Sequence, residues 1–238
     1  MTVVVVMLPE TPPTRLAETT PLDASDADRL RDAMLVDSCR AVAESGGDLL
    51  LNYPDPAAVD GDPEAEARDL AERAGATDAR VEVQVGSTFS ARAGNAVTHL
   101  LEGEGEATAA VVQGDAPLLT RTAIDGAAMR LRRDEVVLAP GGDGRVAYAG
   151  FADPLDFTNA FDAPALTTLT DRGRAADHDV DFLASARVVR TGADLAEVLV
   201  EVRARERAGR AVPTAFAAAV DDLGLDVRAT GDGLAVVS

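Results

Sequence analysis

Apolar and polar positions divide the chain into short β-like runs that alternate with longer helix-like segments. Residues 3–7 form an uninterrupted Val-rich run, which is typical of a strand covered on both faces. Further strands are predicted at residues 49–53, 80–85, 109–113 and 135–139. Apolar positions at helical spacing predict helices at residues 26–44, 63–74, 91–101 and 121–132, with Ser25 as the expected cap of the first.

The alternation is less regular in the second half of the chain. Strands are predicted at 146–151 and 180–183, helices at 164–172, 194–207 and 213–223, and a hairpin at 227–229 and 234–237. This order predicts an α/β fold of three layers, α/β/α, around a mostly parallel mixed sheet. We expect one domain over residues 1–208, followed by an appendage at 209–238 that consists of a helix and a hairpin. No Gly-x-Gly-x-x-Gly motif follows the first strand, which argues against a standard dinucleotide fold.

The charge of the chain is strongly acidic, with a formal net charge of −19 over 238 residues. All 22 basic residues are Arg, and Lys is absent. An acidic, Lys-free composition indicates a halophilic protein, because molar salt screens the self-repulsion. The missing Lys excludes a Schiff base and a P-loop, so Arg, backbone N–H groups or a metal must bind any anion. We expect no nucleic acid partner at this charge.

Cysteine usage and hydropathy indicate the compartment. The single Cys39 lies in the apolar stripe of a predicted helix and cannot form an internal disulfide, which suits a reducing cytosol. Residues 3–7 are too short for a secretory h-region, and no apolar stretch has the length of a membrane span. We therefore expect a cytoplasmic protein with no membrane partner.

Asp115 is the main candidate for chemistry. It stands in Gly-Asp-Ala-Pro (114–117), directly after the predicted strand at 109–113. Ligands of open α/β sheets bind beyond the carboxyl ends of the strands, where an acid can hold a divalent cation and, through it, a phosphate. The alternative is a turn residue that caps the helix beginning near Thr120.

Two other loops follow predicted strands. Residues 8–16 contain three prolines and one cation, Arg15, so this rigid loop suits a phosphate or a nucleotide; an ordinary surface loop is the alternative. Residues 140–145 contain three glycines and Asp143, which could bind a metal or a sugar hydroxyl. A plain hairpin turn explains the Asp-Gly pair equally well.

These loops, in their order, resemble a glycosyltransferase-A-like family of uncharacterised transferases, which is often found beside radical-SAM or selenium-related genes. The chain is more distantly similar to the phospholactate guanylyltransferases. The resemblance covers most of residues 3–195. It runs through Pro-Thr-Arg-Leu (13–16), residues 33–37 and 84–92, Gly-Asp-Ala-Pro-Leu-Leu-Thr (114–120), and Pro-Gly-Gly-Asp-Gly (140–144) to Gly150.

The resemblance implies a nucleotide-diphospho-sugar transferase-like fold and a set of site residues. The first loop, with Leu8, Pro9, Thr14 and Arg15, would cradle the nucleotide. Asp115, after Gly114, matches the family's metal-type Asp and would bind Mg²⁺ or Mn²⁺. Asp143 matches the acid of the family's Asp-Gly turn. Arg92 matches a family Arg that supports the site.

The chain departs from the family pattern at two places. Pro13 stands where relatives carry Lys, and Val188, Arg190 and Thr191 stand where relatives have Asp-x-Asp-Thr. The implied function is a metal-dependent nucleotidyl- or glycosyltransferase that uses an NTP or NDP-sugar and a small-molecule acceptor. The two losses would weaken that activity. The alternative is a non-catalytic nucleotide-binding or regulatory module on the same scaffold.

Overall fold

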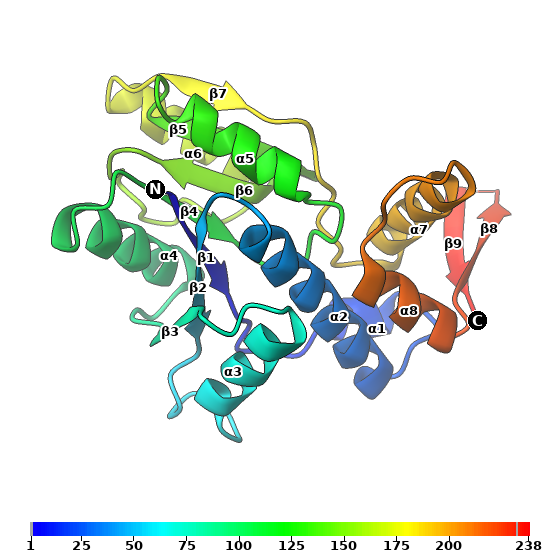
Figure 1. Ribbon diagram of the computed structural model, residues 1–238. Helices are drawn as coiled ribbons and strands as arrows, with labels where there is room; N and C mark the ends of the chain where they lie inside the picture. The colour runs from blue at the N-terminus through cyan, green and yellow to red at the C-terminus, as the bar shows by residue number, and fades with distance from the viewer. Residues whose placement is uncertain (1, 232) are drawn as a thin grey trace.

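The computed structural model describes residues 2–231 and 233–238, and its strands and helices alternate along most of the chain (Figure 1). The strands are β1 (Thr2–Met7), β2 (Asp48–Tyr53), β3 (Arg80–Val83), β4 (Thr108–Val112), β5 (Val136–Gly142), β6 (Arg145–Phe151), β7 (Val180–Phe182), β8 (Asp226–Thr230) and β9 (Gly233–Val237). The helices are α1 (Thr14–Glu18), α2 (Ala24–Ala43), α3 (Pro63–Arg73), α4 (Phe89–Thr98), α5 (Arg121–Arg130), α6 (Ala165–Ala175), α7 (Gly192–Arg207) and α8 (Thr214–Asp222), and a π-helical turn, η1 (His99–Gly103), extends α4.

Seven of the described strands form one mixed sheet in the order β3-β2-β1-β4-β6-β5-β7. All neighbours pair in parallel except β6, which runs antiparallel to both β4 and β5. The interior strand β1 pairs Val5 with Leu50 of β2 and with Val111 of β4. The predicted mostly parallel mixed sheet is confirmed.

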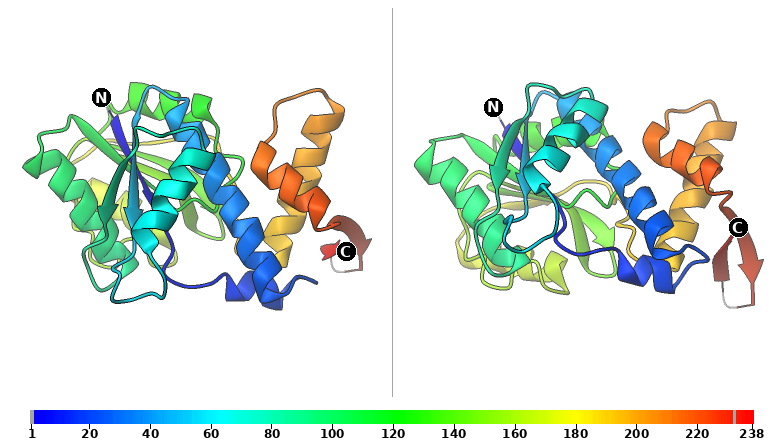
Figure 2. Two further views of the ribbon diagram at one scale, coloured as in Figure 1. Left: turned by 60° about the horizontal axis from the view of Figure 1, so that its bottom comes forward. Right: turned by 90° about the horizontal axis from the view of Figure 1, so that it is seen from below.

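Helices cover both faces of this sheet (Figures 1 and 2). Val4 and Val6 point toward α2, α3 and α5, whereas Val3 and Val5 belong to the core beneath α4 and α6. Successive side chains of a strand point to opposite faces, so burial on both sides explains why β1 reads as a continuous apolar run. The three-layer α/β/α arrangement is therefore present.

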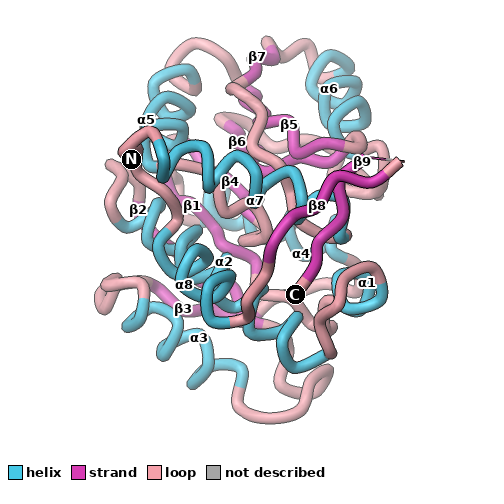
Figure 3. Tube along the Cα trace, turned by 90° about the vertical axis from the view of Figure 1, so that its right-hand side faces the viewer, coloured by secondary structure: helices cyan, strands magenta, loops and turns pink. Residues whose placement is uncertain are grey.

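A third core lies beside the sheet. It joins α1 and the first half of α2 to α7, α8 and β9, and it includes Met34, Leu199, Phe216 and Val236. The buried carboxylate of Asp37 in α2 accepts hydrogen bonds from the backbone N–H groups of Ala215 (3.1 Å) and Phe216 (2.7 Å), which lie in the first turn of α8. The hairpin β8–β9 lies along α7 (Figure 3). The separation of residues 209–238 as an appendage stays a prediction.

Several local expectations were wrong. Asp23, not Ser25, caps α2, because the Asp23 carboxylate accepts from the N–H of Asp26 at 2.9 Å. The last residues of the predicted first loop are helical, because α1 begins directly after Pro13. Strand β3 ends at Val83, two residues early, and the regular α-helix of α4 ends at Thr98. Among the described residues, no helix has the length and apolar character that a membrane crossing requires.

Candidate active site

A cavity of about 780 Å³ opens at the carboxyl ends of β1 and β4. Its walls are the segment after β1, the loop after β4 and residues Val189 and Arg190 before α7, and the lining also includes Phe89 and Phe161. This position at the carboxyl ends of parallel strands is where ligands of α/β folds bind.

The segment after β1 is held on both sides of its prolines. The amide of Gln84 donates to the carbonyl of Leu8 at 2.7 Å, next to the end of β1. At the other end, the N–H of Gly192 donates to the hydroxyl of Thr19, just after α1, at 2.8 Å. Figure 2 shows the segment crossing from the sheet toward α7. These contacts place Arg15 at the rim of the cavity.

A second cavity of about 880 Å³ lies between α2 and α3. Leu8, Arg31 and Leu35 line both cavities, so the segment after β1 separates them. A ligand in one cavity and a ligand in the other would share a wall.

Cations are concentrated in the first cavity although the chain as a whole is acidic. Its described lining contains the four arginines Arg15, Arg31, Arg92 and Arg190 and the three acids Glu10, Asp115 and Asp162. Within the described residues, Arg15 makes no ion pair, whereas Arg92 pairs with Glu10 at 3.0 Å. Burial lowers the pKa of Arg31, an effect that its acidic neighbours Asp28 and Asp32 oppose. The lining can bind anions.

Asp115 and Arg190 form an ion pair at the edge of this cavity. Arg190 Nε lies 2.9 Å from Asp115 Oδ2, and Arg190 Nη2 donates to Gln113 Oε1. The Asp115 side chain is 16% exposed, and its Oδ1 is buried with no hydrogen-bond partner in the described part of the chain. The two segments are also joined through their backbones, since the N–H of Val189 donates to the carbonyl of Asp115 at 2.7 Å.

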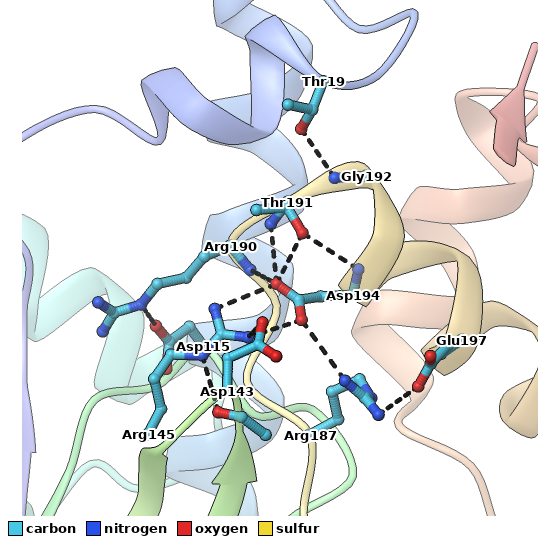
Figure 4. Close-up of polar contacts among 11 residues, drawn as sticks. Thr19, Asp115, Asp143, Arg145, Arg187, Arg190, Thr191, Gly192, Asp194 and Glu197 are labelled. Carbon is cyan, nitrogen blue, oxygen red and sulfur yellow. Dashed lines mark hydrogen bonds and ion pairs between the residues drawn. The ribbon is translucent and has the colours of Figure 1, made fainter. Parts of the chain in front are cut away.

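Asp194 anchors the loop that carries Arg190 (Figure 4). Its carboxylate, 3% exposed, accepts two hydrogen bonds from Arg145 and others from the backbone N–H groups of Arg190 and Thr191. Burial raises the pKa of Asp194, but the hydrogen bonds from Arg145, Thr191 and Arg190 outweigh it, so the net pKa is below its ordinary value. Thr191 and Asp194 also form a capping box that starts α7.

Most of the predicted site residues come together in the first cavity. Its lining includes Leu8, Pro9, Thr14, Arg15, Arg92 and Asp115. Gly114 lies behind this wall, where its carbonyl accepts from the hydroxyl of Ser38 at 3.3 Å. Asp143 stands outside the described lining, in the turn between β5 and β6; its carboxylate is 78% exposed and pairs with Arg145 at 3.1 Å. The structure therefore does not bring Asp143 to the same cavity as Asp115.

A divalent cation does not fit the arrangement at Asp115. The carboxylate already faces a guanidinium, which would repel a dication at such short range. Within residues 2–231 and 233–238, no three Asp, Glu, His or Cys side chains converge in a way that could hold a metal ion. Mg²⁺ at phosphate-transfer sites is bound by one or two carboxylates together with water and substrate phosphates. The Asp115 carboxylate is already engaged by Arg190.

Sequence reasoning missed Gln113, Arg31 and Asp194, and it treated Arg190 only as a lost acid. Asp194 had a recognisable signal, because Thr191 and Asp194 have the spacing of a capping box. Gln113 directly precedes the Gly114 turn, but a neutral side chain at a strand end is a weak signal. The contact of Arg190 with Asp115 spans 75 positions and has no local signature.

The mixed sheet, covered on both faces and hollowed at the carboxyl ends of its parallel strands, is a nucleotide-diphospho-sugar transferase fold. The crystal structure of a "putative nucleotide-diphospho-sugar transferase from Desulfovibrio desulfuricans G20" is similar with a TM-score of 0.72 and 19% identity, over 93% of this chain and 96% of that chain. A cytidylyltransferase from Leptospira borgpetersenii has a TM-score of 0.52 and 9% identity, over 94% of each chain. A CMP:2-keto-3-deoxy-manno-octonic acid synthetase complexed with CTP has a TM-score of 0.51 and 11% identity, over 86% of this chain and 99% of that chain.

At the level of sequence, residues 56–163 match the family described as "Uncharacterized protein conserved in bacteria (DUF2064)". The matched range includes Arg92, Asp115 and Asp143. Together with the structural likeness, this match confirms the resemblance to a glycosyltransferase-A-like family of uncharacterised proteins. No curated protein has a sequence that matches the chain.

Proposed function

We propose that the chain binds an NTP or an NDP-sugar in the cavity at the ends of β1 and β4 and transfers its nucleotidyl or glycosyl group to a small-molecule acceptor. The observation that carries this proposal is the gathering of four arginines around one cavity in a chain with a net charge of −19. Guanidinium groups bind phosphate oxygens through paired hydrogen bonds, so such a lining favours a di- or triphosphate.

The lining suggests how a nucleotide would lie. The apolar and proline-rich wall formed by Leu8, Pro9 and Thr14 suits the base and ribose, and Arg15 at the rim suits a phosphate. Arg92 of α4 pairs with Glu10 and so supports the segment after β1. The resemblance also gives Asp143 a catalytic role, but Asp143 carries no step of the proposed reaction because its carboxylate lies outside the described lining. No step is assigned to Mg²⁺ or Mn²⁺, because a divalent cation does not fit beside the ion pair of Asp115 and Arg190.

A specific observation favours a second candidate, a nucleotide-binding or regulatory module without turnover. The one acid at the end of β4 is already engaged by Arg190, and Pro13 replaces the Lys of relatives. Such a module would bind the same ligands in the same cavity. Product release therefore separates the two candidates, whereas binding does not.

A nucleotide screen tests the proposal. Nucleoside tri- and diphosphates and NDP-sugars are added to the protein at molar KCl, and the unfolding temperature and the release of pyrophosphate or NDP are recorded. We expect at least one nucleotide to raise the unfolding temperature, because a ligand that binds the folded state stabilises it. The Arg15→Gln variant should lose most of this shift, and Arg207→Gln, at the end of α7, should keep it. Binding without product supports the regulatory candidate, and the absence of any shift rejects both.

A further inference from the structure

Arg190 has hydrogen-bonding capacity that the protein does not use. An arginine side chain carries five N–H donors. Its Nε is bound to Asp115 and one donor of Nη2 to Gln113, so the rest of the guanidinium remains for a ligand. The side chain is 45% exposed and lines the cavity. The two acceptors hold the guanidinium plane at the end of β4 before any ligand arrives.

The attachment of Arg190 is rigid on its backbone side as well. Its N–H donates to Asp194 Oδ2 at 3.2 Å, and Asp194 is buried and clamped by Arg145. The preceding residue, Val189, is bonded to the backbone of Asp115. A cation that is fixed in this way needs little reorganisation when it meets an anion, which is the condition for strong electrostatic stabilisation.

We propose that Arg190 is the resident cation of the site and binds the diphosphate of the nucleotide without a divalent metal ion; this inference rests on the proposed function. Asp115 and Gln113 are positioning residues, because they orient the guanidinium and do not themselves contact the phosphates. Arg15, which has no ion pair within the described residues, supplies a second positive charge at the rim. Positive side chains and Mg²⁺ serve the same purpose in transferases, namely to neutralise charge on phosphate oxygens.

Metal-free binding tests this inference. The affinities of CDP, GDP, UDP and inorganic pyrophosphate are measured by calorimetry in EDTA and again in MgCl₂, at low and molar KCl. Wild type should bind at least one of these diphosphates equally well in both buffers. Arg190→Gln should weaken metal-free binding roughly ten- to a hundredfold, the loss expected for hydrogen bonds to a charged group. Arg190→Lys should recover part of it, because the charge is kept while the planar fork is lost.

Arg68→Gln is the matched control. Arg68 in α3 also pairs with an acid, Glu64, at 2.7 Å, but it is not part of the cavity lining. This variant should bind like wild type, and thermal unfolding of every variant confirms that it is folded. Binding that requires MgCl₂, or unchanged or tighter metal-free binding by Arg190→Gln, would overturn the role of Arg190 and leave the proposed function standing. The absence of binding in both buffers would overturn the proposed function and this inference together.

Discussion

At the residue scale, Gly114 fixes the direction in which the chain leaves β4. Its φ is +76°, a left-handed conformation, and a Cβ at this position would lie 2.3 Å from Cδ2 of Leu35. Residues other than Gly rarely adopt this backbone conformation. The turn therefore sets where Asp115, and through it Arg190, can stand.

Gly114→Ala should destabilise the protein by about 1–3 kcal/mol, because both the backbone and Leu35 must shift. The matched control is Gly126→Ala in α5, where no atom lies within 4 Å of the added Cβ. That change should stabilise by about 0.5–1 kcal/mol through helix propensity. Urea unfolding of the two variants measures both effects. Equal stabilities would contradict the strained turn.

Single residues also show where sequence reasoning stops. Asp115 could be placed at a strand end because the apolar run before it and the Gly and Pro around it are local signals. Asp143 belongs to a hairpin turn, as the alternative interpretation had it, and the sequence did not indicate which way its side chain points. The role of Arg190 depends on its contact with Asp115, which lies in a distant segment of the chain. The sequence therefore showed that an acid is missing at this place, but not that Arg190 forms an ion pair there.

At the scale of elements, the helices and strands with clear periodicity agree with expectation to within a few residues, as for α2, β4 and α5. Helix α1 was missed because three prolines suggested a rigid loop, although Pro is well suited to a helix start. The segment between β7 and α7 has no regular pattern, yet it positions Arg190 through backbone contacts with Gly141 and Asp115. Such pairing cannot be read from composition or periodicity.

The start of α7 should make stability depend on pH. The pKa of Asp194 is lower in the folded chain than in the unfolded chain, so the unfolded chain takes up this proton first as the pH falls. The stabilisation is complete above the unfolded pKa, about 4, and is lost as the pH falls through the lower folded pKa. Urea unfolding as a function of pH should therefore show an acid loss of stability that Asp194→Asn reduces.

The same variant should cost on the order of 3 kcal/mol near neutral pH, because it removes the buried partner charge of the largely buried Arg145 guanidinium and leaves only the exposed Asp143. Asp143→Asn removes a carboxylate from the same Arg145 but at an exposed position, so it should cost less than about 1 kcal/mol. Similar losses in the two variants would show that Asp194 is not the anchor of α7.

At the scale of the whole molecule, the fold class followed from the alternation of strands and helices, but the order of the strands did not. Insertion of the antiparallel β6 between β4 and β5 places the Arg145 end of that strand near Asp194 and α7. Long-range pairing of this kind depends on packing of the complete sheet. The third core of α2, α7 and α8 was likewise not visible in any single segment.

The overall charge predicts a response to salt. At a net charge of −19, self-repulsion opposes the compact state, and molar salt shortens the Debye length to about 3 Å. The free energy of unfolding should therefore rise when KCl is increased from the millimolar to the molar range, and most of this rise should occur at low salt. A stability that falls or stays constant with KCl would contradict the proposed halophilic character.

The most direct measurement is a crystal structure of the protein with a nucleoside diphosphate, grown in EDTA. The base and ribose should lie against the segment after β1, and a phosphate should contact the guanidinium of Arg190 while Asp115 still holds Nε. A nucleotide bound elsewhere would contradict the site. Phosphates within the cavity but away from Arg190 would contradict the proposal that Arg190 binds the diphosphate.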